Sequence, residues 1–412
     1  MATLLGVRIR NFKALENLEL GQVQYASGAP LPKFACFIGP NGAGKSSLLD
    51  AFGFIADSLA EGVEAACDKP HRGGFDRLRT QGATGPISFE LFFQDDDELR
   101  PIVYKFDVDI DDAGVPYVAS ESLRQRRRGE TVGKPYHFLK LQHGQGKVWA
   151  GEYLEGTDNA QSAKTKLADI TRLGLSTLGN LEEHPRIVKV RSYVEQWYLS
   201  YFVPEAARDQ PPAGAQRWLD RRGANIANVL QYYQRTHPKH FSGIVKRLTT
   251  AIPGIKEIKT EVSKDKRLLL KFDEDGYRDP FYQQSMSDGT LKILAYGVLL
   301  EDPDPRPLVG IEEPENGLYI ELIERLAANF VSHTARQDAP TQILVTTHST
   351  YFVDALQPDQ VWIMHKDQGR SKAIRVADIP KVKELAAEGI PLGAQWYSRH
   401  FDATSSSRPK AR

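Results

Sequence analysis

The sequence predicts an α/β fold that combines a mixed β-sheet, an antiparallel β meander and a mainly helical insertion. Three observations support this fold class. An apolar strand at 33–38, a glycine-rich loop at 39–44 and a helical pattern at 45–59 follow one another directly. Apolar and polar residues alternate over 86–120, as in antiparallel strands with one face in water. Apolar runs near the C-terminal end, separated by helical stretches, indicate parallel strands.

The remaining elements are expected from the same patterns. Residues 4–9 form the first strand candidate, and helical spacing at Tyr193, Trp197 and Tyr201 and again over 226–233 predicts helices. The parallel strands are expected at 308–311, 342–346 and 361–364. The predicted organisation is an N-terminal part of the α/β domain at 1–155, a mainly helical insertion at 156–255, a C-terminal part at 256–402 and a disordered tail at 403–412.

Composition is that of an ordinary globular protein. Of the 412 residues, 41% are hydrophobic and 26% are charged, which fits one large domain or a domain with an insertion. Lys+Arg and Asp+Glu both total 53, so net charge does not indicate a general polyanion-binding protein. No apolar run approaches the roughly 20 residues that span a bilayer, so we expect no membrane contact. The two cysteines, Cys36 and Cys67, and the lack of a secretory signal favour a cytoplasmic location.

The glycine-rich loop predicts a phosphate-binding site. Residues 39–46 read Gly-Pro-Asn-Gly-Ala-Gly-Lys-Ser and fit the pattern G-x-x-x-x-G-K-[ST]. Glycines let backbone N–H groups converge on phosphate oxygens, and the following helix directs its positive N-terminal end at the same charge. We expect Lys45 to reach the β- and γ-phosphates and Ser46 to hold Mg²⁺. The predicted nucleotide-binding residues here are Gly39, Pro40, Asn41, Gly42, Ala43, Gly44, Lys45, Ser46 and Ser47.

Two of the predicted parallel strands end in residues suited to phosphate hydrolysis. The strand at 308–311 is followed by Glu312 and Glu313. Because parallel strands deliver their carboxyl ends to the ligand crevice, we expect Glu312 to hold Mg²⁺ through water and Glu313 to orient or deprotonate the attacking water. His348 follows the strand at 342–346, where it can donate a hydrogen bond to a γ-phosphate or to that water.

A third polar segment precedes the two carboxylates. Ser287, Asp288 and Gly289 stand before an apolar helical run at 291–300. Taken alone, this pattern indicates an ordinary helix N-cap. Its place shortly before the double carboxylate favours an anion site at the helix start.

Together these elements resemble the ABC-type P-loop ATPase heads of SMC, RecF and OLD proteins. The segments "MSDGTLKIL", "GIEEPENGL" and "VTTHS" are similar in particular to the AAA_21 type of bacterial AAA family ATPases. The likeness covers 1–60 and 280–400. The chain departs from ABC transporters, which generally have Asp where Glu312 stands, and from its relatives at Tyr319-Ile320, where they often have His-Pro.

The resemblance implies further site residues. The start of the chain is similar to the N-terminal strand of those proteins, which adds Asn11 and Lys13 to the predicted nucleotide-binding residues. It implies that Ser287, Asp288 and Gly289 form a signature that contacts the γ-phosphate held by a second protomer. It places a D-loop at Asn316 and Gly317. ATP and Mg²⁺ are the implied cofactors.

The implied function is an ATPase that hydrolyses ATP to ADP and phosphate. It would close as a head-to-head homodimer, or a higher homo-oligomer, and act as a switch for a separate effector protein. The resemblance to OLD heads implies a nuclease as the candidate effector, in bacterial anti-phage defence or DNA transactions. We expect it to be a separate chain, because the sequence after His348 has no Asp-x-Asp and Asp107-x-Asp109 lies in the meander.

Two alternatives remain open. One is a RecF- or SMC-like DNA-binding repair ATPase, although no long coiled coil is visible; the other, less favoured, is a transporter ATPase subunit. Nucleic acid could contact the basic run at 124–129 or the lysines at 256–267.

Overall fold

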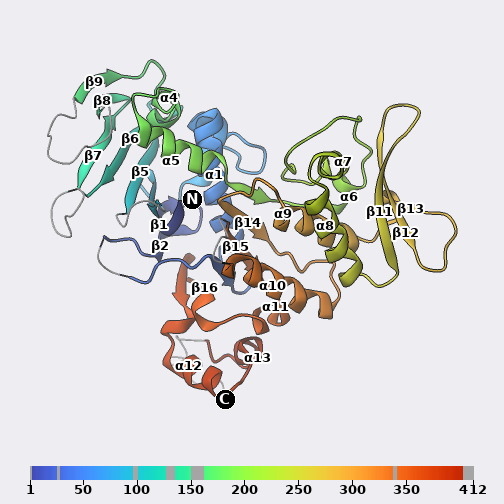
Figure 1. The fold of residues 1–412 in the computed structure, drawn as a ribbon. Helices are drawn as coiled ribbons and strands as arrows, with labels where there is room; N and C mark the ends of the chain where they lie inside the picture. The colour runs from blue at the N-terminus through green and yellow to red at the C-terminus, as the bar shows by residue number, and fades with distance from the viewer. Residues whose placement is uncertain are drawn as a thin grey trace. The chain divides into compact units, whose positions relative to one another are not determined.

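The computed structural model describes residues 2–25, 28–95, 101–126, 135–149, 162–336 and 341–401 (Figure 1). The chain forms two compact units. The first consists of Met1–Trp197 and Asp359–Asp378, and the second of Tyr198–Pro358 and Ile379–Arg412. The predicted tail at 403–412 lies outside the described residues. Within the described part, no helix is both long and apolar enough to cross a membrane.

The first unit is built on an antiparallel sheet that contains the predicted meander. Phe89, Leu91, Phe106 and Val108 alternate with polar residues and are fully buried, so one face of the sheet packs on the core. All neighbouring strands pair antiparallel. In spatial order the strands are β2 (Leu15–Gly21), β1 (Thr3–Phe12), β4 (Ile87–Gln94), β5 (Ile102–Ile110), β6 (Pro116–Gln125), β7 (Tyr136–Gln142), β8 (Gln145–Trp149) and β9 (Ser162–Lys166).

A second layer of the first unit carries the glycine-rich loop. The buried strand β3 (Phe34–Ile38) pairs parallel with β16 (Val361–Asp367), which pairs antiparallel with β17 (Arg370–Arg375). Helix α1 (Lys45–Glu61) is buried along most of its length, and its Phe54 stacks on Phe89 of the meander. The other helices of this unit are α2 (Val63–Cys67), α3 (Phe75–Leu78), α4 (Gly174–Leu178) and α5 (Pro185–Glu195).

The second unit combines a parallel sheet with helices and a separate antiparallel hairpin. The parallel strands are β10 (Tyr198–Ser200), β14 (Leu308–Glu312) and β15 (Gln342–Thr347), in that order. The hairpin sheet contains β11 (Ile255–Val262), β12 (Leu268–Glu274) and β13 (Phe281–Tyr282). The helices are α6 (Pro204–Ala207), α7 (Ile226–Thr236), α8 (Pro238–Ala251), α9 (Asp288–Leu300), α10 (Ile320–Ala335), α11 (Thr350–Asp354), α12 (Pro380–Ala387) and α13 (Leu392–Tyr397).

The predicted α/β class and the parallel strands are confirmed, whereas the helical insertion at 156–255 is not one lobe. Its β9 extends the antiparallel sheet of the first unit, and its β10 pairs with β14 in the second unit. The helix expected through Tyr193, Trp197 and Tyr201 ends at Glu195. Aromatic side chains at a spacing of four mimic a helix here, but Trp197 instead packs edge-on against Phe52 of α1, just before β10 begins.

A buried carboxyl group joins β6 to α4 in the first unit. Glu121 is 1% exposed and accepts hydrogen bonds from the backbone N–H groups of Gly174 and Leu175 and from the hydroxyl of Tyr104. Burial raises the pKa of Glu121 to about 7, although these three donors act in the opposite direction.

This raised pKa predicts a pH-dependent stability. Between pH 4.5 and 7 the unfolded chain has released the proton of Glu121 while the folded chain still holds it, so stability falls as pH rises through this window. The loss should be on the order of 3 kcal/mol. We expect Glu121→Gln to remove that part of the pH dependence in urea unfolding, while Glu64→Gln, at an exposed position of α2, should not. Equal pH dependence of Glu121→Gln and the wild type would contradict the assignment.

Candidate functional site

The phosphate loop of the first unit has the backbone that its sequence predicts. Gly39 and Gly44 have φ angles of 151° and 103°, which favour glycine. A Cβ at Gly39 would lie 2.2 Å from the carbonyl oxygen of Met364 in β16, and one at Gly44 would lie 2.2 Å from the Ser371 hydroxyl in β17. The loop therefore passes too close to both strands to carry side chains at these positions.

Lys45 points into this loop. Its ammonium is buried and donates to the carbonyl oxygen of Gly39 at 2.8 Å and to that of Pro40 at 3.4 Å. Ser46 is exposed in the first turn of α1, a helix of 17 residues whose first N–H groups have no partner within the helix. A buried ammonium and a helix N-terminus at one loop are suited to binding a phosphate chain.

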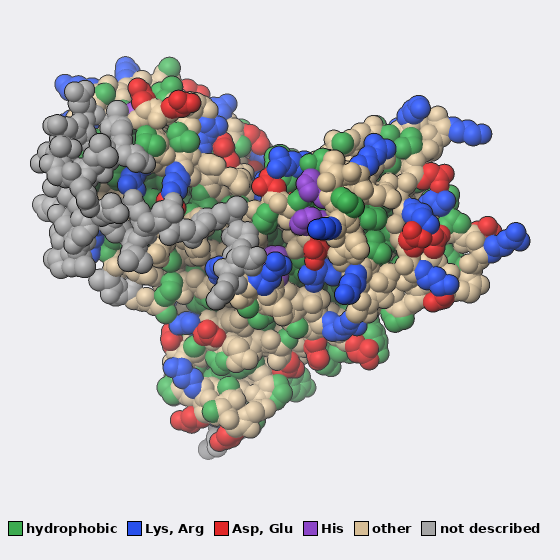
Figure 2. Space-filling view, in the orientation of Figure 1, with side chains coloured by type: hydrophobic (Ala, Val, Ile, Leu, Met, Phe, Trp, Pro, Cys, Tyr) green, Lys and Arg blue, Asp and Glu red, His purple; other side chains and the backbone are tan. Residues whose placement is uncertain are grey.

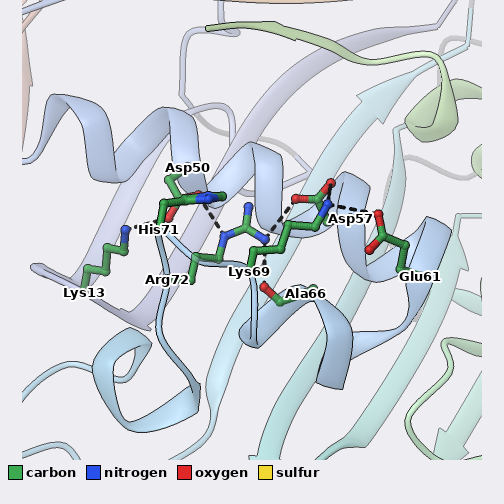
Figure 3. Close-up of polar contacts among 8 residues, drawn as sticks. All are labelled: Lys13, Asp50, Asp57, Glu61, Ala66, Lys69, His71 and Arg72. Atoms are coloured by element: carbon green, nitrogen blue, oxygen red, sulfur yellow. Dashed lines mark hydrogen bonds and ion pairs between the residues drawn. The ribbon is translucent and has the colours of Figure 1, made fainter. Parts of the chain in front are cut away.

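Of the predicted residues, Asn11 lies near the end of β1 and Lys13 in the tight turn between β1 and β2, and both have a positive φ angle. The Asn11 amide donates to the carbonyl oxygen of Pro86 at 3.0 Å. The Lys13 ammonium forms an ion pair with Asp50 of α1 at 2.6 Å, which Figure 3 shows. Since Asp50 follows Ser46 by one helical turn, Lys13 is held next to the helix that begins at the phosphate loop.

Arg72 completes the ion-pair cluster around α1 (Figure 3). Its side chain is 1% exposed, and its guanidinium lies 2.9 Å from carboxylate oxygens of both Asp50 and Asp57. Lys69, which like Arg72 lies in the segment after α2, forms an ion pair with Asp57 at 3.0 Å. Burial raises the pKa of Asp50, but the charges of Arg72 and Lys13 outweigh burial and hold this pKa below its usual value. The sequence pattern did not reveal this cluster.

In the second unit, the predicted Glu313 and His348 are in contact. Glu313 follows β14 with a φ angle of 43° and donates its backbone N–H to Thr346 of β15 at 2.8 Å. His348 Nδ1 lies 3.2 Å from a Glu313 carboxylate oxygen, and the Asn316 amide donates to the other oxygen at 2.8 Å. The Glu313 side chain is 27% exposed, so its carboxylate is oriented by two partners and still reaches solvent.

Two residues that sequence reasoning missed support this pair. Glu315 is 5% exposed and accepts hydrogen bonds from the Thr347 hydroxyl and from the backbone N–H of His348 at 3.0 Å. Lys292 of α9 is also buried, and burial lowers its pKa against the opposing charges of Glu315, Asp288 and Glu313. A lysine inside an apolar helical run was the one sequence signal for Lys292.

The predicted signature and D-loop also meet in the second unit. Ser287 is the N-cap of α9, and its hydroxyl oxygen accepts a hydrogen bond from the N–H of Thr290 at 3.2 Å. A Cβ at Gly289 would lie 2.9 Å from the carbonyl oxygen of Gly317, so this glycine permits the close approach. Ser287 and Asp288 are exposed. Arg208, which the sequence did not indicate, bonds to Asp288 and to the carbonyl of Met286.

The residues predicted to hold Mg²⁺ offer suitable donors. The Ser46 hydroxyl and the Glu312 carboxylate are oxygen ligands, which Mg²⁺ prefers, and neither is fully buried. The described residues contain no group of three or more His, Cys, Asp or Glu side chains that could hold a metal alone. Each of the two, Ser46 and Glu312, is by itself the kind of ligand that Mg²⁺ takes beside several waters and phosphate oxygens. Asp107 of the meander accepts a hydrogen bond from the Ser120 hydroxyl at 2.5 Å and forms an ion pair with Lys105 at 3.2 Å.

Comparison with known proteins shows a family and a fold. The family model "AAA domain, putative AbiEii toxin, Type IV TA system" matches residues 34–354. The fold is similar to an Smc head bound to the C-winged helix domain of ScpA, with a TM-score of 0.56, 14% identity and coverage of 90% of this chain and 97% of that one. A search of curated proteins gives no match.

Two Smc heads from the genus Pyrococcus are also similar to this chain in fold. One, with an extended coiled coil and bound to the C-terminal domain of ScpA from Pyrococcus furiosus, has a TM-score of 0.56 and 12% identity, over 94% of this chain and 100% of that one. One from Pyrococcus yayanosii has a TM-score of 0.51 and 11% identity, with the same coverage. At these identities the likeness concerns the fold.

The family match extends from the strand before the phosphate loop to the helix after His348, and so includes every motif placed above except Asn11 and Lys13. The predicted family and fold class are both confirmed. The chain belongs to this AAA-domain family, AAA_21, and has the α/β fold of an SMC-type P-loop ATPase head.

Proposed function

We propose that the protein binds ATP with Mg²⁺, hydrolyses it, and uses the cycle as a switch for a partner protein. The contact of Glu313 with His348 and Asn316 carries this proposal. A phosphate loop alone accounts for nucleotide binding. An oriented and partly exposed carboxylate at a strand end is what activation of a water requires in addition.

The contacts support the following proposed roles. Lys45 and the N–H groups of the phosphate loop bind the β- and γ-phosphates, with Asn11 and Lys13 beside them. Glu313 accepts a proton from the attacking water, and His348 donates a hydrogen bond to the water or to the γ-phosphate. Glu315 is a positioning residue, because it accepts from the backbone N–H of His348. Mg²⁺, held by Ser46 and Glu312, would neutralise charge on the phosphates.

The switch rests on the exposed signature. Ser287 and Asp288 face solvent at the start of α9, so a second protomer could bring them to a γ-phosphate. ATP then becomes part of a two-fold interface between heads, and its hydrolysis weakens that interface. We propose that a separate effector reads this motion, with a nuclease as the candidate, in cytoplasmic anti-phage defence or DNA transactions.

The first prediction separates binding from hydrolysis. Glu313→Gln should lower the ATP hydrolysis rate at least about 100-fold, the usual contribution of a general base, while ATP still binds. Lys45→Ala should weaken ATP binding itself, since it removes the charge that meets the phosphates. Phosphate release and nucleotide titration measure the two effects. Glu321→Gln, at an exposed carboxylate of α10, is the matched control. Hydrolysis by Glu313→Gln at the wild-type rate would refute its role.

The second prediction tests the signature in trans. Ser287→Arg should abolish hydrolysis and keep nucleotide binding, because the cation blocks the neighbour's site and not its own. Mixed with Lys45→Ala, it should regain activity: half of the dimers are mixed, and each has one of two working sites, so about a quarter of the wild-type rate is expected.

A matched variant isolates the structural role of Ser287. Ser287→Ala removes the N-cap of α9, at a cost of about 1 kcal/mol, without adding a charge, and should reduce the activity less than Ser287→Arg does. If the mixture stays inactive although subunit exchange is demonstrated, Ser287 does not act in trans.

A further inference from the structure

One row of side chains crosses one face of the meander from β2 to β9. Its members lie directly opposite one another on neighbouring strands, so the Cα atom of each is about 5 Å from the Cα atom of the next. The pairing register places them in a single line. In spatial order they are Glu19, Arg8, Glu90, Lys105, Ser122, Lys140, Lys147 and Lys164.

The first half of this row is electrically balanced. Arg8 lies 2.7 Å from Glu19 and 2.6 Å from Glu90, and Glu90 also pairs with Arg124. Lys105 pairs with Asp107 at 3.2 Å. Alternating charges on facing positions stabilise a sheet, so folding alone explains this half.

The second half begins at Ser122 and continues with three lysines, here called the lysine row: Lys140, Lys147 and Lys164. Each is exposed, and among the described residues none forms an ion pair or a side-chain hydrogen bond. Lys166 lies next to the row on β9, opposite Gln145. Burial lowers the pKa of His137 on β7, and the charges of Lys140 and Arg124 lower it further.

Stability does not explain the lysine row, because like charges directly opposite each other destabilise a sheet. We propose that the lysine row binds the phosphate backbone of a nucleic acid. Three lysines at strand spacing span about 10 Å, the length over which one strand of a duplex presents about three phosphates. Gln142 and Gln145 lie beside the row and can donate to phosphate oxygens, as uncharged side chains commonly do.

Other polyanions fit this face less well. A membrane surface is usually met by aromatic or aliphatic side chains beside the basic ones. The large apolar side chains exposed in the described residues lie elsewhere than on β7, β8 and β9. A phosphate backbone needs only evenly spaced cations on a polar surface, and binds without regard to sequence.

The basic segments singled out from the sequence are not equivalent to the lysine row. Arg124 is neutralised by Glu90, and 127–129 lie outside the described residues. In the hairpin, Lys256 pairs with Asp275 and Lys259 with Glu257 and Asp273. Figure 2 shows acidic and basic side chains intermixed on this hairpin. Three lysines of this hairpin, Lys256, Lys259 and Lys271, each have a carboxylate partner and therefore serve as a control for the three lysines of the lysine row.

The test is binding of the full chain to a labelled DNA duplex, measured from 50 to 200 mM salt. Replacing the lysine row by Lys140→Gln, Lys147→Gln and Lys164→Gln should reduce the slope of log affinity against log salt by about 2.7, or 0.9 for each phosphate contact. The affinity lost across this salt range should then be about 40-fold smaller than in the wild type. The control, Lys256→Gln, Lys259→Gln and Lys271→Gln, changes net charge equally and should keep the wild-type slope.

Further variants and probes test the proposal in the same binding experiment. Lys→Arg at the same three positions should retain binding, and the Gln variant should melt no lower than the wild type. If the triple variant does not fold, Lys164→Gln alone should reduce the slope by about 1. Single-stranded DNA and duplex RNA distinguish the forms of backbone, with a smaller slope for single strands. Equal slopes of the lysine-row and control variants would overturn the proposal, and so would binding to phosphatidylserine vesicles without binding to nucleic acid.

Discussion

The need to neutralise two carboxylates inside the first unit determines how its parts are arranged around the phosphate loop. Asp50 and Asp57 lie on α1, where the packing of the helix leaves them almost no access to water. Removing one partner from a buried ion pair typically costs about 3–5 kcal/mol, so such groups keep their partners. Their partners come from two places: Lys13 from the β1–β2 turn, and Lys69 and Arg72 from the segment after α2. The cluster thereby ties the start of the chain to the helix that begins at Lys45.

In the second unit, hydrogen bonds between polar groups at strand ends hold the candidate site residues in place. The carboxyl ends of β14 and β15 lie side by side, so residues far apart in sequence arrive together there. Glu315 is buried and bonds to Thr347 and His348, which sets the direction in which His348 leaves the strand. His348 then meets Glu313, whose positive φ angle turns it out of the strand. Lys292 adds a positive charge behind these carboxylates.

Sequence reasoning succeeded where the signal is local and failed where it depends on contacts. The strand and helix on either side of the glycine-rich loop, and the strands that end before Glu313 and His348, were predicted correctly, because glycine spacing and apolar runs ending in polar residues can be seen within a few positions. Arg72, Lys292 and Arg208 are ordinary residues by sequence, and only their distant partners give them a role. The helix expected through Trp197 was wrong because periodicity does not report the packing of Trp197 on Phe52 or the pairing of β10 with β14.

The lysine row depends on strand register, which single-strand periodicity does not fix. Lys140, Lys147 and Lys164 come from three strands, and the sequence between them includes residues outside the described part of the chain. The buried carboxyl groups named above in the first unit have the partners that stability requires. Asp50, Asp57 and Glu90 each form an ion pair with a cation, and Glu121 accepts hydrogen bonds from three donors. A fold that satisfies buried charges so consistently has no structural need for three facing lysines without counter-charges. Their cost to the isolated sheet is small because they are exposed and screened by salt, and it is offset when an anion lies across them. The contrast between the two halves of one row therefore separates charges that serve folding from charges available to a ligand.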